Sequence, residues 1–264
     1  MGSRRLRRER FFSDHPNCCF CGGDTQAVEK DHIPSRSLFD DRQWPEEYVF
    51  PACTSCNRCT SDAERIIALI SRLHDGDPGE GSEACLRKHA QAVGRRNPDI
   101  LSALQPTVRT ARNAAKKYGV AVPNGKVSTE MGFLDLSHPG ILEAITIFGR
   151  KLSLALYYKH TGRILGSRGG IAVNWFTNLE LTAGELPPKV LSVMNGFPKV
   201  ERANTSLGKQ FYYRYGITAC KTALGFVAYF RQSFAILGFV SPSAERLKTK
   251  SDVQFIHGPF SREH

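Results

Sequence analysis

Two pairs of cysteines, each with two residues between its members, constrain this chain more than any other feature. The first pair is Cys18 and Cys21, and the second is Cys53 and Cys56. This spacing is typical of zinc knuckles, and two knuckles can place four thiolates at the corners of a tetrahedron, about 2.3 Å from one metal ion. The sequence therefore predicts a structural Zn²⁺ site that joins two separate segments.

Two additional cysteines leave a choice of register. Cys19 has the wrong spacing from Cys21 to form a knuckle with it. Cys59 follows Cys56 at the two-residue spacing and could pair with it instead. We choose the register that ends at Cys56, because Asn57 then falls at the start of the next predicted helix, whose apolar face continues to about residue 74.

Cysteine usage and hydropathy indicate a compartment. Eight cysteines in 264 residues do not make a disulfide scaffold, and their paired spacing favours metal binding in a reducing cytoplasm. The longest apolar region, residues 222–240, is interrupted at residues 231–233 and falls short of the roughly 18 apolar residues of a membrane span. The Arg-rich N-terminus lacks the apolar core of a secretion signal. We therefore expect a cytoplasmic protein that does not enter the membrane.

A second set of reactive groups lies beside the cysteine pairs. Asp31 and His32 close a short strand-like segment, and Asn57 directly follows Cys56. Carboxylate and amide oxygens are ligands that a hard cation such as Mg²⁺ prefers. A neutral histidine next to such a cation is suited to abstracting a proton. These residues are therefore candidates for catalysis, in addition to the predicted zinc ligands.

The order of these motifs resembles a known family. The chain has Cys-x-x-Cys, then Asp-His-Ile-Pro at residues 31–34, then Cys-x-x-Cys-Asn. This order resembles the zinc-stapled form of the HNH endonucleases, in particular bacterial members of mostly unassigned role. The resemblance covers residues 15–75 and implies a small ββα-metal module that hydrolyses phosphodiester bonds. It implies that His32 is the general base and that Asp31 and Asn57 bind a catalytic Mg²⁺ or Mn²⁺.

One position departs from the family pattern. The middle Asn of the family, which orients the His-bearing loop, usually lies five residues before the third cysteine, where this chain has Tyr48. The orienting group is therefore open, and an alternative function is a zinc-knuckle module that binds nucleic acid without cutting it. The presence of Asp31 and Asn57 favours the nuclease, since a pure binder has no need of ligands for a catalytic ion.

The charge of the chain favours a polyanionic partner. Its 36 Lys and Arg outnumber 25 Asp and Glu, which gives a net charge of +11. Residues 1–16 form a basic arm, and Arg109, Arg112 and Lys116 are spaced to line one face of a helix. We expect Arg36 and these three side chains to contact phosphate, most simply that of double-stranded DNA.

The remaining patterns predict an α+β fold. After the HNH-like module at residues 17–75, residues 83–126 form a basic helical segment, predicted as helices at 83–93 and 98–118. A C-terminal α+β domain at 127–264 follows, with a long core helix at 139–160 and an antiparallel β meander. We predict its strands at 172–176, 210–218, 223–232 and 234–240, and a short helix at 187–194. This domain could recognise a target or a protein partner, as in an effector of a bacterial defence system.

Overall fold

The computed structural model is a mixed α and β structure in which all strand pairing is antiparallel among the residues described. The predicted helix at 187–194 lies outside those residues. The described ranges are 3–40, 44–45, 47–73, 79–121, 132–184, 199–200, 210–248 and 256–260.

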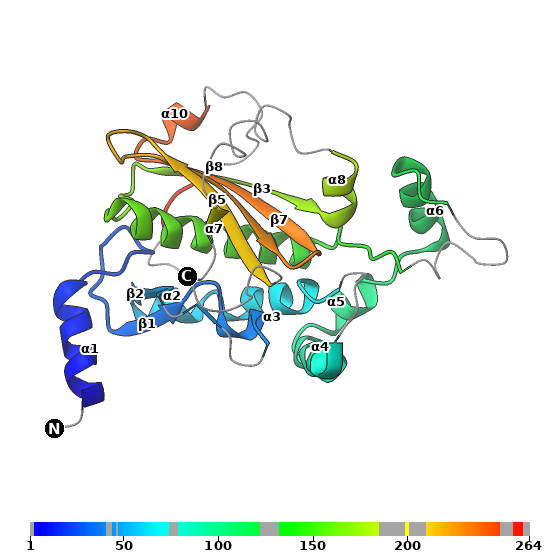
Figure 1. Cartoon of the computed structure of the whole chain (residues 1–264), viewed down its shortest axis with the longest axis horizontal. Helices are drawn as coiled ribbons and strands as arrows, with labels where there is room; N and C mark the ends of the chain where they lie inside the picture. Colours follow the sequence, from blue (N-terminus) through cyan, green and yellow to red (C-terminus); the bar gives the residue numbers. More distant parts are fainter. Residues whose placement is uncertain are drawn as a thin grey trace.

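Helix α7, Pro139–Thr161, lies at the centre of the structure (Figure 1). Its bounds agree with the predicted core helix. The ring of His138 accepts a hydrogen bond from the N–H of Gly140 at the start of the helix, and Gly162 ends it in the left-handed conformation, with φ of 68°. Buried side chains lie on nearly every side of α7, so the helix must be covered by two layers.

A six-stranded sheet forms the first of these layers. Its order is β4-β5-β6-β7-β3-β8, and the hairpins β5–β6 and β6–β7 form the predicted meander, which is confirmed. Phe226 and Phe230 of β6 point toward α7, where the ring of Phe230 meets that of Phe148 at 5.4 Å between centroids. The strands are β3 Gly170–Thr177, β4 Lys199–Val200, β5 Phe211–Ile217, β6 Leu224–Phe230, β7 Phe234–Ser241 and β8 Ile256–His257.

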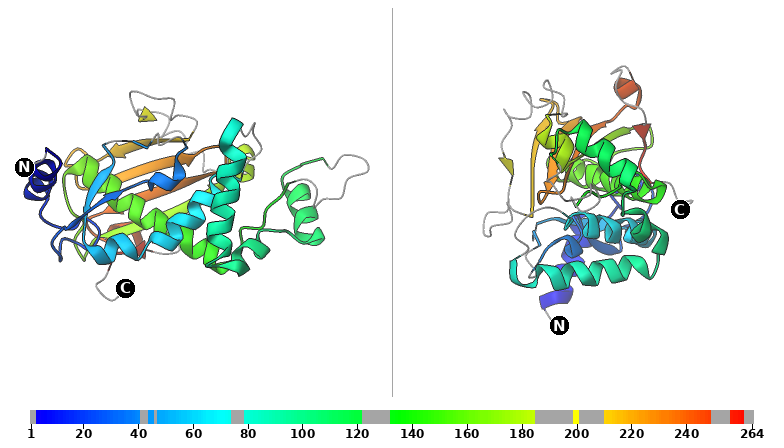
Figure 2. Two further views of the ribbon diagram at one scale, coloured as in Figure 1. Left: turned by 90° about the horizontal axis from the view of Figure 1, so that it is seen from below. Right: turned by 90° about the vertical axis from the view of Figure 1, so that its right-hand side faces the viewer.

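The N-terminal half of the chain forms the second layer, on the other side of α7 (Figure 2). Helix α3, in which Ile66, Ile67 and Ile70 are buried, packs on α7, and the β1–β2 hairpin lies beside it. Buried residues of this layer, of α7 and of the sheet belong to one hydrophobic cluster. The elements are α1 Ser3–Asp14, β1 Glu29–His32, the 3₁₀ helix η1 Arg36–Leu38, β2 Val49–Ala52, α2 Thr54–Arg58 and α3 Ser61–Ile70.

Two helices predicted as continuous are interrupted. The helix expected from Asn57 to about residue 74 is split into α2 and α3. Thr60 lies at the break, and its φ of −100° and ψ of −2° depart from the values of a regular helix. The helix expected at 98–118 is split into α5, Pro98–Ala103, and α6, Val108–Lys117. Pro106 causes this break, since its ring disfavours a helical residue before it, and Thr107 then caps α6.

The basic helices extend away from the two layers. Helix α4, Gly79–Gly94, contacts α3 and α5, whereas α6 projects from one end of the molecule. Helix α1 lies at the opposite end, as both Figure 1 and the left view of Figure 2 show. The two predicted nucleic-acid contacts, the N-terminal arm and α6, are therefore far apart along the longest axis.

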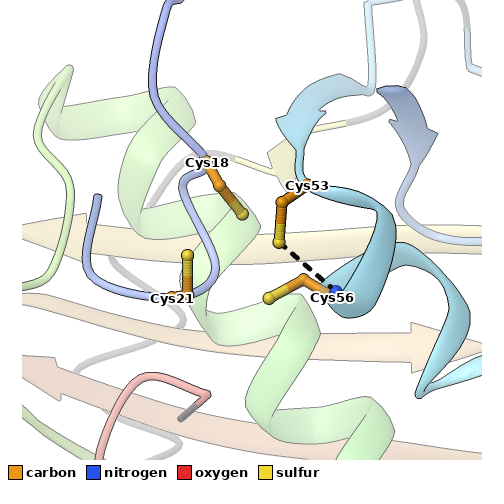
Figure 3. Close-up of side chains that lie close together, drawn as sticks. All are labelled: Cys18, Cys21, Cys53 and Cys56. Atoms are coloured by element: carbon orange, nitrogen blue, oxygen red, sulfur yellow. Dashed lines mark hydrogen bonds between the residues drawn. The ribbon is translucent and has the colours of Figure 1, made fainter. Parts of the chain in front are cut away.

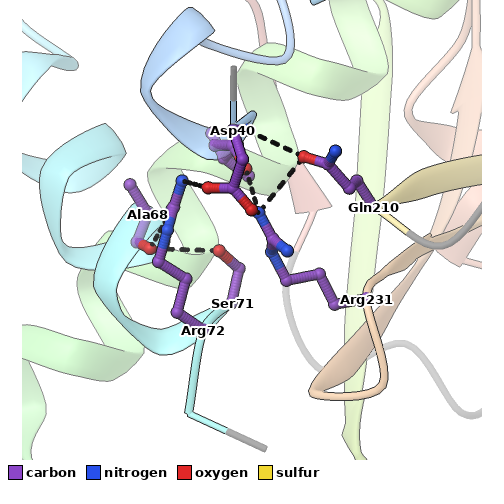
Figure 4. Close-up of polar contacts among 7 residues, drawn as sticks. Asp40, Ala68, Ser71, Arg72, Gln210 and Arg231 are labelled. Atoms are coloured by element: carbon purple, nitrogen blue, oxygen red, sulfur yellow. Dashed lines mark hydrogen bonds and ion pairs between the residues drawn. The ribbon is translucent and has the colours of Figure 1, made fainter. Parts of the chain in front are cut away.

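A charged cluster ties the loop after η1 to both layers (Figure 4). The carboxylate of Asp40 accepts hydrogen bonds from Arg72 at 2.9 Å and from Arg231 at 2.7 Å. The backbone N–H of Asp40 also donates to the side chain of Gln210 at 2.9 Å. Arg72 follows α3 and Arg231 lies in the β6–β7 turn, so this carboxylate links the hairpin layer to the sheet.

Among the described helices, none combines the length and the apolar character that crossing a membrane requires.

The close contact between β7 and β6 generates a stability prediction. A Cβ atom at Gly238 would overlap the ring of Phe226, which is fully buried. We expect Gly238→Ala to lower the free energy of unfolding by about 1–3 kcal/mol, because an overpacked core forces side chains off their rotamers. Gly166→Ala is the matched control, since nothing lies within 4 Å of its added methyl group. Chemical denaturation measures both, and equal stability of the two variants would contradict the predicted overlap.

Candidate functional site

Four buried thiols meet where the first knuckle approaches the second (Figure 3). The sulfur atoms of Cys18, Cys21, Cys53 and Cys56 all lie within 4.8 Å of one another. These are the predicted zinc ligands, brought together from the loop before β1 and from the start of α2, where Cys53 is the N-cap and Cys56 lies within the helix. The spacing of the four sulfurs fits a tetrahedral ion, so the cluster could hold one structural zinc.

The surroundings of the thiols suit metal binding. The backbone N–H groups of Phe20 and Cys56 point at the sulfurs of Cys18 and Cys53, at 3.4 Å and 3.5 Å. A hydrogen bond from Cys56 lowers the pKa of Cys18 to about 5, so one thiolate is present at neutral pH. Cys59 lies outside the cluster and contacts the carbonyl of Cys56 instead, at 3.7 Å.

Successive side chains of β1 point to opposite faces of the hairpin, which separates Asp31 from His32. Asp31 is only 6% exposed, and its carboxylate lies 2.6 Å from the ammonium of Lys151 on α7. Burial raises the pKa of Asp31 to about 6, with a further contribution from the charge of Glu64. The predicted metal ligand therefore faces the interior, where a lysine binds it.

His32 faces the other way, and Arg36 holds its ring. Arg36 donates an N–H to Nε2 of His32 at 2.6 Å, and its guanidinium stacks over the ring of Trp44 at 4.4 Å. Because arginine has no acceptor, Nε2 must carry a lone pair, and the imidazole is neutral. Burial and, to a smaller extent, the positive charges of Arg36 and Lys30 together lower the pKa of His32 to about 4.

His32 lines a basic hollow between α1, β1 and η1. The hollow has a volume of about 730 Å³, and every other residue that lines it is Arg or Lys. Helix α1 is fixed there by Arg8, which donates to the carbonyl of Val28 at 2.7 Å, and by Lys30, whose ammonium lies 4.3 Å from the centre of the Phe11 ring. The lining residues are Arg4, Arg5, Arg7, Arg8, Lys30, His32 and Arg36.

Asn57, the other predicted ligand of a divalent ion, bonds to a different carboxylate. Its amide donates a hydrogen bond to Glu29, two residues before Asp31. This bond lowers the pKa of Glu29, despite an opposing effect of burial. The arrangement does not fit a divalent ion shared by Asp31 and Asn57, because the first is bound by Lys151 and the second by Glu29.

Tyr48 stands at the position of the family's middle Asn, and its side chain does not point toward His32. Its hydroxyl donates to that of Tyr213 at 2.9 Å, and Tyr213 in turn lies 2.7 Å from Nε2 of His160. The link to the His-bearing segment is through the backbone, since the N–H of Ile33 donates to the carbonyl of Tyr48 at 3.2 Å. The hydroxyl of Tyr48 therefore anchors the hairpin to the sheet and to α7.

The predicted basic stripe is present on α6. Arg109, Arg112 and Lys116 are all exposed, whereas Ala111 and Ala115 on the opposite side are buried. Among the described residues, none of the three basic side chains forms an ion pair that would neutralise it. The stripe could therefore accept phosphate groups, but α6 lies at the opposite end of the molecule from α1, which lines the hollow together with His32.

Sequence reasoning did not identify three contributors to these sites. Lys151 interrupts the apolar stripe of α7 between Phe148 and Leu152, and a charge at such a position is a signal for a buried ion pair. Glu29 and Lys30 directly precede Asp31, and strand alternation alone would have placed them on opposite faces of the hairpin. Their partners on distant segments are visible only in the folded chain.

Comparison with known protein families, with characterised proteins and with solved structures finds no match to this chain. The resemblance to the HNH endonucleases therefore depends on the motif residues alone.

The cysteine cluster generates a test of its register. We expect purified protein to contain about one zinc per chain, because the four sulfurs match its preferred ligand set. Cys56→Ser should lower the melting temperature and the zinc content, since the metal supplies folding free energy. Cys59→Ser, the neighbouring control outside the cluster, should leave both unchanged. Equal damage from the two substitutions, measured by metal analysis and thermal unfolding, would show that the other register is used.

Proposed function

We propose that this protein is an HNH-type endonuclease that hydrolyses phosphodiester bonds of nucleic acid, with His32 as the general base. The observation that supports this function best is the hollow around His32. It combines one neutral imidazole with six Arg and Lys side chains. Cationic side chains bind and neutralise phosphate, and a neutral imidazole beside them can accept a proton.

The proposed chemistry uses groups of this chain in separate roles. Arg36, which donates to Nε2 of His32 in the free protein, turns to the phosphate and frees that lone pair. Nε2 then takes a proton from a water molecule, whose oxygen bonds to phosphorus. The bond from phosphorus to the leaving 3′ oxygen breaks, and this oxygen takes a proton from solvent. Arg36 and Lys30 stabilise the charge that develops on the phosphate. Phosphate binding also raises the basicity of His32, because its negative charge offsets the cations that hold the pKa low.

The resemblance also implies a catalytic Mg²⁺ or Mn²⁺, which would bind the scissile phosphate and stabilise the leaving oxygen. We assign no step to this ion, because the carboxylate of Asp31 is buried and bound by Lys151.

Double-stranded DNA is the proposed substrate. The hollow and the α6 stripe lie at opposite ends of the molecule, so a rigid polyanion that runs along the protein is better suited to contact both than a short, compact ligand. A duplex carries one phosphate charge per about 1.7 Å of its axis, which offers contacts along this whole length.

The alternative is a module that binds nucleic acid without cutting it. The pairing of Asp31 with Lys151 and the presence of Tyr48 in place of an Asn favour this alternative. Both functions use the same basic surfaces, so only a cleavage assay separates them.

His32 provides the direct test of catalysis. We expect His32→Ala to reduce plasmid cleavage by about 10²–10⁴-fold, because a general base contributes about that factor. Zinc content, melting temperature and DNA affinity should stay close to those of the unsubstituted protein, since His32 contacts neither the cysteine cluster nor the core.

His89→Ala is the matched control for this substitution. Burial also lowers the pKa of His89 to about 4, but His89 lies on α4, outside the hollow. If His32→Ala cleaves at the rate of the unsubstituted protein, His32 is not the general base. An absence of cleavage by the unsubstituted protein, together with tight DNA binding, would favour the binding module.

The α6 stripe provides a test of phosphate contact. We expect the triple substitution of Arg109, Arg112 and Lys116 to Ala to weaken duplex binding and to reduce the slope of log K against log salt by about two to three units, because each phosphate contact contributes about 0.9. Arg109→Lys with Arg112→Lys is the control, since it keeps the charges and should keep the slope. An unchanged slope in the triple variant would mean that α6 does not contact phosphate.

A further inference from the structure

Lys151 carries a positive charge into the centre of the molecule. The residue is 0% exposed, and it projects from the middle of α7 toward the β1–β2 hairpin. Its ammonium contacts three oxygen atoms: a carboxylate oxygen of Asp31 at 2.6 Å, one of Glu64 at 2.8 Å, and the hydroxyl of Thr60 at 2.5 Å. The contacts with Thr60 and Glu64 are hydrogen bonds, and the contact with Asp31 is an ion pair.

Asp31, Glu64 and Thr60 form a cage around the ammonium, and this cage has the composition of a cation site. Two carboxylates and a hydroxyl are oxygen ligands of the kind that hold Mg²⁺ or Mn²⁺, and here they surround a lysine. The two carboxylates raise the pKa of Lys151, although burial has the opposite and larger individual effect. The ammonium is therefore charged at neutral pH, and it compensates carboxylates that would otherwise repel each other inside the protein.

The cage is also closed off from the hollow. Asp31 and His32 are adjacent in β1 and point to opposite faces, so the cage lies on the interior side of the strand and the hollow on the other. The ring of Phe20 packs 5.4 Å from the ammonium. A cation held by Asp31 would thus contact α3 and α7, whereas a phosphate in the hollow would contact His32.

We propose that the ammonium of Lys151 is the resident cation beside Asp31, in the place where the HNH resemblance implies a divalent ion. In this role Lys151 positions β1, the strand that carries His32. The lysine belongs to the central helix and the carboxylates to β1 and α3, so the cage joins three elements of the two layers. Lys151 acts through Asp31 and does not touch substrate. Its effect on cleavage depends on the proposed nuclease function, whereas its role as the cation does not.

Two consequences distinguish this assignment from a divalent-ion site. The unsubstituted protein has no Mn²⁺ bound by Asp31, so Asp31→Asn leaves Mn²⁺ binding unchanged. Conversely, Lys151→Ala leaves two buried carboxylates without a counter-charge and opens space between them. We expect this variant to melt about 6–20 °C lower, as breaking a buried ion pair does in a chain of this size. Added Mn²⁺ should bind in the space and raise the melting temperature again.

The first experiment measures Mn²⁺ binding to the zinc-loaded protein by the loss of the free-ion electron paramagnetic resonance signal. The unsubstituted protein and Asp31→Asn should give the same titration. A Mn²⁺ site that is present in the unsubstituted protein and lost in Asp31→Asn would overturn the proposal, since a divalent ion would then displace Lys151 from the carboxylate. This comparison requires neither catalytic activity nor a folded Lys151 variant.

The second experiment uses Lys151→Ala and the double variant Asp31→Asn with Lys151→Ala. Mn²⁺ should raise the melting temperature of the first and not of the second, and it should restore His32-dependent cleavage by Lys151→Ala. A Lys151→Ala protein that melts like the unsubstituted protein would contradict the proposal. If the unsubstituted protein does not cleave, the nuclease function fails, while the melting temperatures still report on the cation site.

Discussion

The burial of α7 on nearly all sides is the constraint on which the rest of the structure depends. A helix with apolar side chains around its whole circumference must be covered by two layers, because one layer would leave half of that surface in water. The sheet covers one side, and the hairpin with α3 covers the other. The hairpin layer shares one hydrophobic cluster with α7 and the sheet, so α7 supplies much of the apolar surface against which the predicted zinc cluster and the His-bearing strand are fixed.

Most local features of this arrangement follow from short stretches of sequence. The spacing of the four cysteines predicted their cluster, because knuckle geometry is determined within a few residues. The bounds of α7 followed from Pro139 at its start and Gly162 at its end, and the meander followed from aromatic and β-branched runs with short breaks between them. The break before α6 was missed, although Pro106 marks it, because apolar residues at helical spacing, such as Ile100, Leu104 and Ala111, continue on both sides of the proline.

The contacts of the candidate site could not be predicted in this way, because they join residues far apart in the chain. Asp31 and Asn57 were assigned from a motif, which specifies the order of residues but not the charge that α7 brings against them. Lys151 is 120 positions after Asp31, and its partner Glu64 lies on another helix. A lysine within an apolar stripe indicates a buried pair, but many carboxylates of the chain could complete it. Only the folded chain shows that its partner is Asp31, the predicted metal ligand.

The two faces of β1 thereby carry opposite electrostatic arrangements. On the interior face, Lys151 lies between Asp31, Glu64 and Thr60, and these contacts contribute to the docking of the strand. On the exterior face, six cations surround His32, and their mutual repulsion destabilises the free protein. In the proposed function, a bound polyanion would relieve this repulsion and stabilise the folded chain by an amount that grows with its free concentration relative to Kd. The pKa of His32 is low because of burial and, in addition, because of the charges of Arg36 and Lys30. The cations that would attract phosphate therefore also lower the pKa of the proposed base, so binding and activation of this histidine would be coupled through one set of charges.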